Sequence, residues 1–108
     1  IQREKENIMR DAKLLEEAGS FSMVLECVQT SLAKQVTKSV SIPTIGIGAS
    51  NNCDGQILVF DDLIGLNPIK FRFVKKYSNI KTEISKAVFK YASEVKKRKF
   101  PSKKYSFN

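Results

Sequence analysis

Two nearly continuous apolar runs lie close together in this chain, Phe21-Ser22-Met23-Val24-Leu25-Glu26-Cys27-Val28 and Ile42-Pro43-Thr44-Ile45-Gly46-Ile47-Gly48. Such runs are typical of strands that are covered on both faces. Between them, Leu32, Val36 and Val40 form one stripe at helical spacing, and Thr30 or Ser31 can cap the start of that helix. The order strand, helix, strand predicts a βαβ unit with parallel strands and a right-handed crossover.

Further elements are predicted on both sides of this unit. Before it, residues 2–18 place Ile8, Ala12 and Leu15 on one helical face, and Gly19 lies where a left-handed residue would end the helix. After it, a loop over 49–55 leads to a third strand over 56–60 and a short helical turn over 61–65.

The C-terminal part predicts a long helix over residues 79–97, because its apolar residues keep a three-and-four spacing. Pro101 prevents any continuation of this helix, and the tail is expected to dock through Tyr105 and Phe107. Taken together, the elements predict an α/β protein with about three parallel strands in one domain, residues 1–108. Three strands are too few to close a barrel.

Composition limits the classes of function. No apolar run approaches the roughly 18 residues of a membrane-spanning helix, and the polar opening predicts no signal peptide, so a cytoplasmic protein is expected. With 2 Cys and 0 His in the chain, a zinc site is not expected. Cys27 and Cys53 are interpreted as buried apolar fillers, although the sequence leaves a disulfide open.

The net charge of +8 comes entirely from residues 55–108, because residues 1–54 are slightly acidic, and the positive charge is densest over residues 90–104. A basic stripe of this kind can bind nucleic acid or an acidic surface. Aromatic residues are not interleaved with the lysines as a base-stacking platform would require, so a solvated helix end is the favoured interpretation.

Glu26 is the candidate catalytic residue. Parallel α/β folds bind ligands at the carboxyl ends of their strands, and a carboxylate at the end of Met23-Val24-Leu25 is out of character for a buried strand. On a period of two it shares a face with Val24 and Val28, and desolvation there would strengthen it as a base. The alternatives are a carboxylate that faces water at the sheet rim or one that is paired with a lysine.

Two other motifs are weaker candidates. The Gly46-x-Gly48-Ala49-Ser50 stretch could hold a phosphate, but it lacks the remaining residues of the known phosphate-binding motifs, so tight backbone packing is favoured. Asp61 and Asp62 could share a metal, but adjacent side chains diverge, so Asp62 as a helix N-cap is favoured. No metal site is predicted within this chain.

An ordered series of motifs resembles the ketopantoate hydroxymethyltransferase family across essentially the whole chain. The series includes Asp11-Ala12-Lys13-x-Leu15-Glu16-Glu17-Ala18-Gly19, Val24-Leu25-Glu26-Cys27-Val28, Ile42-Pro43-Thr44-Ile45-Gly46-Ile47-Gly48-Ala49 and Cys53-Asp54-Gly55-Gln56-Ile57-Leu58-Val59. It continues with Leu63-Ile64-Gly65-Leu66, Lys70-Phe71, Phe73-Val74-Lys75-Lys76-Tyr77, Phe100-Pro101 and Ser106-Phe107. The chain departs from the family pattern at Gln29, Asp61 and Tyr105, where the family commonly has Pro, His and His.

The resemblance implies a (β/α)8 TIM barrel of the phosphoenolpyruvate/pyruvate type, of which this chain supplies the C-terminal segment. It also implies transfer of a hydroxymethyl group from 5,10-methylenetetrahydrofolate to 3-methyl-2-oxobutanoate, which forms ketopantoate for pantothenate synthesis. Mg²⁺ would stabilise the enolate of the keto acid, with its ligands in the N-terminal half, and Glu26 would remove the proton from C3. A homo-oligomer is implied as well.

The alternative hypothesis is a non-catalytic remnant, or a partner-binding α/β module that uses its basic C-terminal helix. If the chain is instead a segment of the transferase, the segment alone is expected to be inactive, because a base without the metal cannot generate the enolate. It is also expected to be poorly stable, because an unpaired sheet edge remains.

Overall fold

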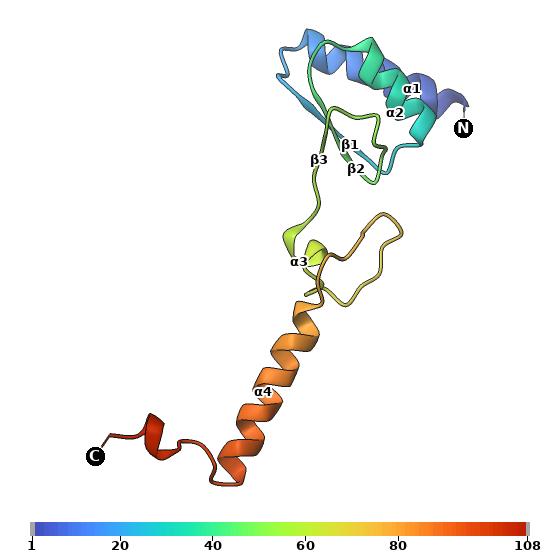
Figure 1. Ribbon diagram of the computed structural model, residues 1–108. Helices are drawn as coiled ribbons and strands as arrows, with labels where there is room; N and C mark the ends of the chain where they lie inside the picture. Colours follow the sequence, from blue (N-terminus) through green and yellow to red (C-terminus); the bar gives the residue numbers. More distant parts are fainter. Residues whose placement is uncertain (1, 108) are drawn as a thin grey trace. The chain divides into compact units, whose positions relative to one another are not determined.

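The computed structural model describes residues 2–107 and divides them into two compact units (Figure 1). Unit 1 comprises the residues up to Val59 together with Phe71–Val74, and unit 2 comprises Phe60–Lys70 and the residues from Lys75 onward. The prediction of one domain over residues 1–108 includes residues 1 and 108, which lie outside the described residues, and it stays a prediction.

Unit 1 begins with helix α1, Gln2–Glu17, and the glycine predicted to end it does so. Gly19 has a φ of 96°, its N–H donates to the Glu16 carbonyl at 3.0 Å, and the Ser20 N–H donates to the Leu15 carbonyl at 3.1 Å. This pair of bonds satisfies carbonyls that the last turn of a helix leaves without partners. The chain can therefore reverse directly into the first strand.

Three parallel strands form the sheet of unit 1, in the order β1-β2-β3. They are β1 (Met23–Glu26), β2 (Thr44–Ile47) and β3 (Gly55–Gln56). Helix α2, Thr30–Ser39, connects β1 to β2, so the predicted βαβ unit and the α/β fold class are confirmed. The register pairs Met23 with Thr44 and Glu26 with Ile47, which brings the carboxyl ends of β1 and β2 together.

The strands are shorter than predicted, and the third is displaced. The predicted strand over 56–60 is wrong beyond Gln56, because only the Ile57 N–H still donates to the sheet, to the Gly46 carbonyl at 3.0 Å. The side chains of Ile57 and Val59 are 47% and 55% exposed. The apolar character of residues 57–60 is therefore not sufficient to extend β3 beyond Gln56.

The expectation that β1 is covered on both faces is wrong for the residues described. Met23 and Leu25 are buried, whereas Val24 is 56% exposed and Glu26 is exposed. The cause is one-sided packing, since α1 and α2, which pack against each other, supply the neighbours of the buried face only. The face with Val24 and Glu26 is left open.

Helix α2 starts one residue earlier than the predicted caps imply, so the prediction of Thr30 or Ser31 as N-cap is wrong. The N-cap is Gln29, in extended conformation and without a side-chain capping hydrogen bond. Its carbonyl accepts the first bond of the helix, from the Ala33 N–H at 2.9 Å. Both hydroxyl residues therefore belong to the first turn, where they cannot cap it.

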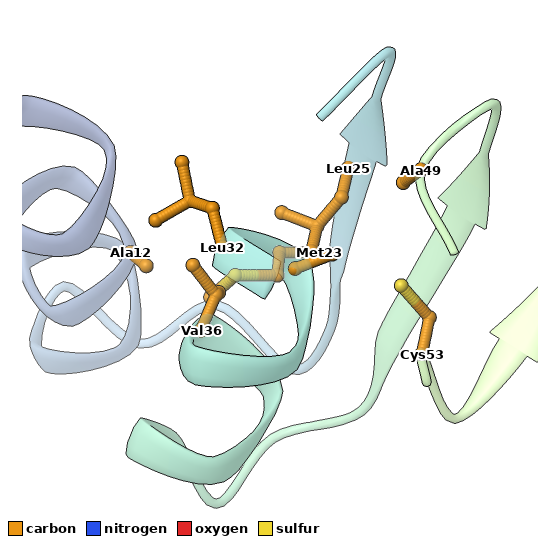
Figure 2. Packing of buried hydrophobic residues seen from close by; sticks show 8 residues of the cluster. Ala12, Met23, Leu25, Leu32, Val36, Ala49 and Cys53 are labelled. Carbon is orange, nitrogen blue, oxygen red and sulfur yellow. The ribbon is translucent and has the colours of Figure 1, made fainter. Parts of the chain in front are cut away.

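The hydrophobic core of unit 1 lies between the two helices and the sheet (Figure 2). Val36 of α2 lies at the end of the Met23 side chain of β1, and Leu32 of α2 belongs to the same cluster, as does Ala12 of α1. Ala49 and Cys53, from the loop after β2, complete the cluster. Burying a side chain such as Leu32 or Val36 contributes about 1.5–3 kcal/mol, so this small core is the main source of stability in unit 1.

Unit 2 contains α3 (Phe60–Leu63), α4 (Ile80–Lys96) and a 3-10 turn, η1 (Lys103–Tyr105). The predicted long helix is confirmed, but none of its described residues is buried. In the tail, Phe100 contacts Tyr91 at 5.5 Å and Tyr105 at 6.0 Å between ring centroids, so Tyr105 docks as predicted. Phe107 is fully exposed, so its predicted docking is wrong.

Within residues 2–107, no helix has the length and apolar character that crossing a membrane requires.

Candidate functional site

Glu26 lies at the carboxyl end of β1, where the sequence predicts the site. The next residue, Cys27, has a φ of 53°, a left-handed conformation that is uncommon for a residue with a side chain. Its N–H donates to the Ile47 carbonyl at 3.0 Å, which fixes the turn against the end of β2. Strained residues of this kind gather at functional sites, and here the turn ends β1 directly after the carboxylate.

The predicted surroundings of Glu26 are only partly correct. Val24 does share its face, but the turn at Cys27 breaks the period of two, and Val28 packs against the core instead. Because the Glu26 side chain is exposed, the predicted desolvation is absent among the residues described. No ion pair joins Glu26 to a lysine or arginine in residues 2–107, so of the two alternatives the structure shows a carboxylate at the sheet rim.

Two cavities of unit 1 meet at the end of β1. The smaller one, of about 190 Å³, is lined by Glu26 together with residues of α1 and α2, including Lys5, Ile8 and Leu32. The larger one, of about 750 Å³, lies between the start of α2 and the loop after β2. Cys27, Val28 and Gln29 line both.

The larger cavity is lined by groups of several chemical types. Its rim carries the hydroxyl residues Thr30 and Ser50, the amide of Gln56, the guanidinium of Arg72 and the ring of Phe73. The Gln56 Nε2 donates to the Ser50 carbonyl at 2.6 Å, which holds the loop after β2 against the end of β3. The arrangement offers one cation, one aromatic surface and several hydrogen-bonding groups at the same edge of the sheet as Glu26.

Gly46 in β2 and Gly48 directly after it have packing roles, as the sequence favoured. Gly48 has a φ of 63°, and a Cβ at this position would lie 2.7 Å from the Phe73 Cγ. A Cβ on Gly46 would lie 3.0 Å from the Gln56 Oε1 and 3.1 Å from the Cys53 Sγ. Both glycines therefore let other groups approach the strand end closely.

Asp61 and Asp62 do not form a joint site. Asp62 is buried within α3, not at its N-cap as predicted, and its Oδ1 accepts a hydrogen bond from the Asn67 Nδ2 at 2.7 Å. Asp61 is exposed. Across residues 2–107 no group of three or more His, Cys, Asp or Glu side chains could hold a metal ion.

Both cysteines are free, which answers the question that the sequence left open. Cys53 is buried in the core as a filler, as predicted, whereas Cys27 is exposed at the turn after Glu26, so the filler interpretation is wrong for it.

Sequence reasoning missed Gln56, Arg72 and Phe73 as residues of the site. Arg72 and Phe73 belong to the segment Phe71–Val74, which joins unit 1 although it follows α3 in the chain. Hydrophobic periodicity predicts helices and strands, but it does not predict that a later loop packs against an earlier sheet. The signals in the sequence were the glycine pair Gly46 and Gly48 at the end of β2, which leaves room for a close neighbour, and the family motif that includes Phe73.

Comparison with known proteins identifies the family. A sequence model of the family described as ketopantoate hydroxymethyltransferase matches residues 1–103. Proteins named 3-methyl-2-oxobutanoate hydroxymethyltransferase are 62% identical over 104 residues in Pelagibacter ubique and 56% over 102 residues in Clostridium kluyveri. The relative of that name in Sulfurisphaera tokodaii is 50% identical over 104 residues.

These alignments cover 96%, 94% and 96% of this chain, but 40%, 36% and 39% of the relatives. The chain thus spans about two fifths of the length of the curated relatives it matches, which is consistent with part of a barrel. The match extends through the whole βαβ unit and its carboxylate at the end of β1. This chain therefore belongs to the ketopantoate hydroxymethyltransferase family.

Proposed function

We propose that this chain is the C-terminal segment of an enzyme that transfers a hydroxymethyl group from 5,10-methylenetetrahydrofolate to 3-methyl-2-oxobutanoate. The product is ketopantoate, an intermediate of pantothenate and coenzyme A synthesis. The observation that carries this proposal is the place of Glu26, at the carboxyl end of a parallel strand and inside the family motif Val24-Leu25-Glu26-Cys27. The names of the relatives support hydroxymethyl transfer to 3-methyl-2-oxobutanoate.

Glu26 is the proposed general base. Its carboxylate removes the proton from C3 of the keto acid, and the resulting enolate carbon forms a bond to the methylene carbon of the folate. The two bonds from that carbon to the folate nitrogens break, and a water molecule supplies the hydroxyl oxygen of the product. The proton taken from C3 and one proton of the water pass to the two nitrogens, and tetrahydrofolate leaves. The position of Glu26 on the open face of β1 supports this role, since a substrate can reach it there.

Mg²⁺ is the proposed cofactor, but the described residues do not form a site for it. Its ligands are therefore expected in the part of the relatives that this chain does not match. For the same reason we propose that the segment alone is inactive. In a complete (β/α)8 TIM barrel, preceding strands would pair with the free edge of β1. The face of β1 that holds Val24 and Glu26 would then be covered by the rest of the barrel.

The proposal includes a homo-oligomer in the cytoplasm. The exposed apolar side chains of α4, among them Ile84, Val88 and Phe89, support a neighbour for this helix. We do not propose nucleic acid as a partner.

The test is a ketopantoate-forming assay with Mg²⁺ and methylenetetrahydrofolate, on the protein extended to the full length of its relatives. Glu26→Gln should lower kcat about 10²- to 10⁴-fold, the range that a positioned general base contributes. Glu17→Gln is the matched control, because Glu17 is an exposed carboxylate of α1 and should tolerate the same change. Full activity in Glu26→Gln would contradict the proposal, and no activity in the unmodified protein would favour the non-catalytic remnant.

A further inference from the structure

The larger cavity of unit 1 has a composition that the removal of a proton from a small keto acid does not require. We infer that it binds the folate co-substrate, with Phe73 stacking on one of its rings and Arg72 binding a carboxylate of its tail. This inference rests on the proposed function and adds to it a place for the one-carbon donor. The cavity volume of about 750 Å³ falls within the roughly 300–1,000 Å³ of small-molecule sites, whereas the cavity beside Glu26, of about 190 Å³, does not.

Arg72 supplies the charge that a carboxylate needs. Its side chain is exposed at the cavity, and no carboxylate lies within ion-pair distance of it in residues 2–107. A guanidinium binds a carboxylate through two parallel hydrogen bonds, which a lysine cannot reproduce. The first turn of α2 borders the same cavity and has no side-chain cap, so its N–H groups add positive potential there.

Phe73 supplies a fixed aromatic surface. Its ring packs against Gly48, where no Cβ intervenes, and it stacks with Phe71 at 5.7 Å between centroids and 23° between planes. The side chain is only partly buried, so part of it remains available to a ligand. Stacking of this kind is worth about 0.5–1.5 kcal/mol between aromatic side chains and selects planar ligands.

The polar groups of the rim suit a nitrogen-rich ring. The Gln56 Nε2 is engaged with the Ser50 carbonyl, whereas its Oε1 accepts no hydrogen bond from the residues described. That oxygen can accept from an N–H of a reduced pterin, and the hydroxyl of Thr30 can donate or accept.

The place of the cavity suits a donor of a one-carbon unit. It shares Cys27, Val28 and Gln29 with the cavity lined by Glu26, so both open at the turn that ends β1. Cys27 follows Glu26 directly in the chain and lines the larger cavity, so a folate bound there would lie next to the end of β1 that carries the proposed base.

The experiment measures binding by calorimetry to the full-length protein, with two probes. One probe is 5-formyltetrahydrofolate, which carries the aminobenzoyl-glutamate tail, and the other is 6-methyltetrahydropterin, which lacks the tail and its carboxylates. Arg72→Gln should weaken the first probe about tenfold or more, the usual effect of losing a hydrogen bond to a charged group, and leave the second unchanged. Phe73→Leu should weaken at least the first probe by several-fold.

Lys70→Gln is the matched control, because it removes the same charge from a nearby exposed position that does not line the cavity. It should leave both affinities unchanged. The inference is overturned if Arg72→Gln and Phe73→Leu both bind 5-formyltetrahydrofolate like the unmodified protein. In that case continued formation of ketopantoate would leave the proposed function intact, whereas a protein that neither binds the folate nor forms ketopantoate would overturn both.

Discussion

Glu16 shows how one side chain holds two segments of unit 1 together. Its Oε1 accepts hydrogen bonds from the Ser41 Oγ, from the Ser41 N–H at 2.6 Å and from the Ile42 N–H at 3.2 Å. The Ser41 hydroxyl is the largest of the causes that lower the pKa of Glu16, and the Ser41 N–H is the next. The carboxylate thus fixes the end of α1 to the turn that leads into β2.

A pH dependence follows from this lowered pKa. Because the carboxyl binds protons more weakly in the folded state than in the unfolded state, its contribution is fully present above the ordinary carboxyl range. It is lost as the pH falls below that range, through the folded pKa. In the full-length protein, Glu16→Gln should therefore lower Tm at neutral pH, and the difference from the unmodified protein should shrink as the pH falls below the ordinary carboxyl range and through the folded pKa.

Thermal melts at a series of pH values would measure this difference. Glu17→Gln is the control, because Glu17 is the adjacent glutamate and makes none of these hydrogen bonds. The Tm difference that this variant shows should not depend on pH in the same way. If the Tm difference between Glu16→Gln and the unmodified protein stays constant down to acid pH, the negative charge of Glu16 does not contribute to stability.

At the scale of elements, a small polar network fixes the amino end of the sheet. Thr44, fully buried at the start of β2, shares a hydrogen bond of 2.8 Å between its Oγ1 and the Thr37 Oγ1 of α2. Its N–H donates to the Asp54 Oδ2 at 2.9 Å, and the Asp54 N–H donates back to the Thr44 Oγ1 at 3.3 Å. One hydroxyl therefore connects a helix, a strand and the loop before β3, at the end of the sheet away from Glu26.

Thr44→Val should destabilise the fold without touching the site. The methyl group fills the same volume but leaves the Asp54 N–H and the Thr37 hydroxyl without their partner, at a cost of about 1–3 kcal/mol in the free energy of unfolding. Urea denaturation of the full-length protein measures it, with Thr82→Val on the exposed surface of α4 as the control. An unchanged urea midpoint in Thr44→Val would refute a structural role for the network.

The elements also show what the sequence could and could not predict. The βαβ unit and the long α4 were predictable because their patterns are local, with apolar runs for strands and a three-and-four spacing for helices. The end of β3 was not, because Ile57 and Val59 are apolar and leave the ladder for want of a partner. Glu26 could be predicted because a carboxylate is unusual at the end of an apolar strand. Arg72 could not, because it reaches the site through a loop, and loops have no hydrophobic periodicity that predicts their position.

For the whole molecule, the described residues leave much apolar surface uncovered. Val24 and Ile57 of unit 1 are about half exposed, β1 forms an edge of the sheet, and α4 buries none of its residues. The chain spans about 40% of the length of a relative such as that of Pelagibacter ubique. The part of such a protein that this chain does not match is long enough to cover these exposed apolar surfaces.

The isolated chain should therefore be marginally stable. We expect a broad thermal transition by circular dichroism, or self-association by sedimentation, since a small core must offset the entropy of ordering the chain. The full-length protein should melt at a markedly higher temperature under the same conditions. A sharp cooperative melt of a monomer by the isolated chain would contradict this account.

The most direct test of the central claim, that Glu26 is the base, is exchange of the C3 proton of 3-methyl-2-oxobutanoate with deuterated water. The reaction would contain the full-length protein and Mg²⁺ but no folate, and NMR would follow loss of the C3 proton signal. The account predicts catalysed exchange by the unmodified protein and by Glu17→Gln, and a loss of about 10²-fold or more in Glu26→Gln. Exchange at an undiminished rate in Glu26→Gln would contradict it and assign the proton transfer to another group.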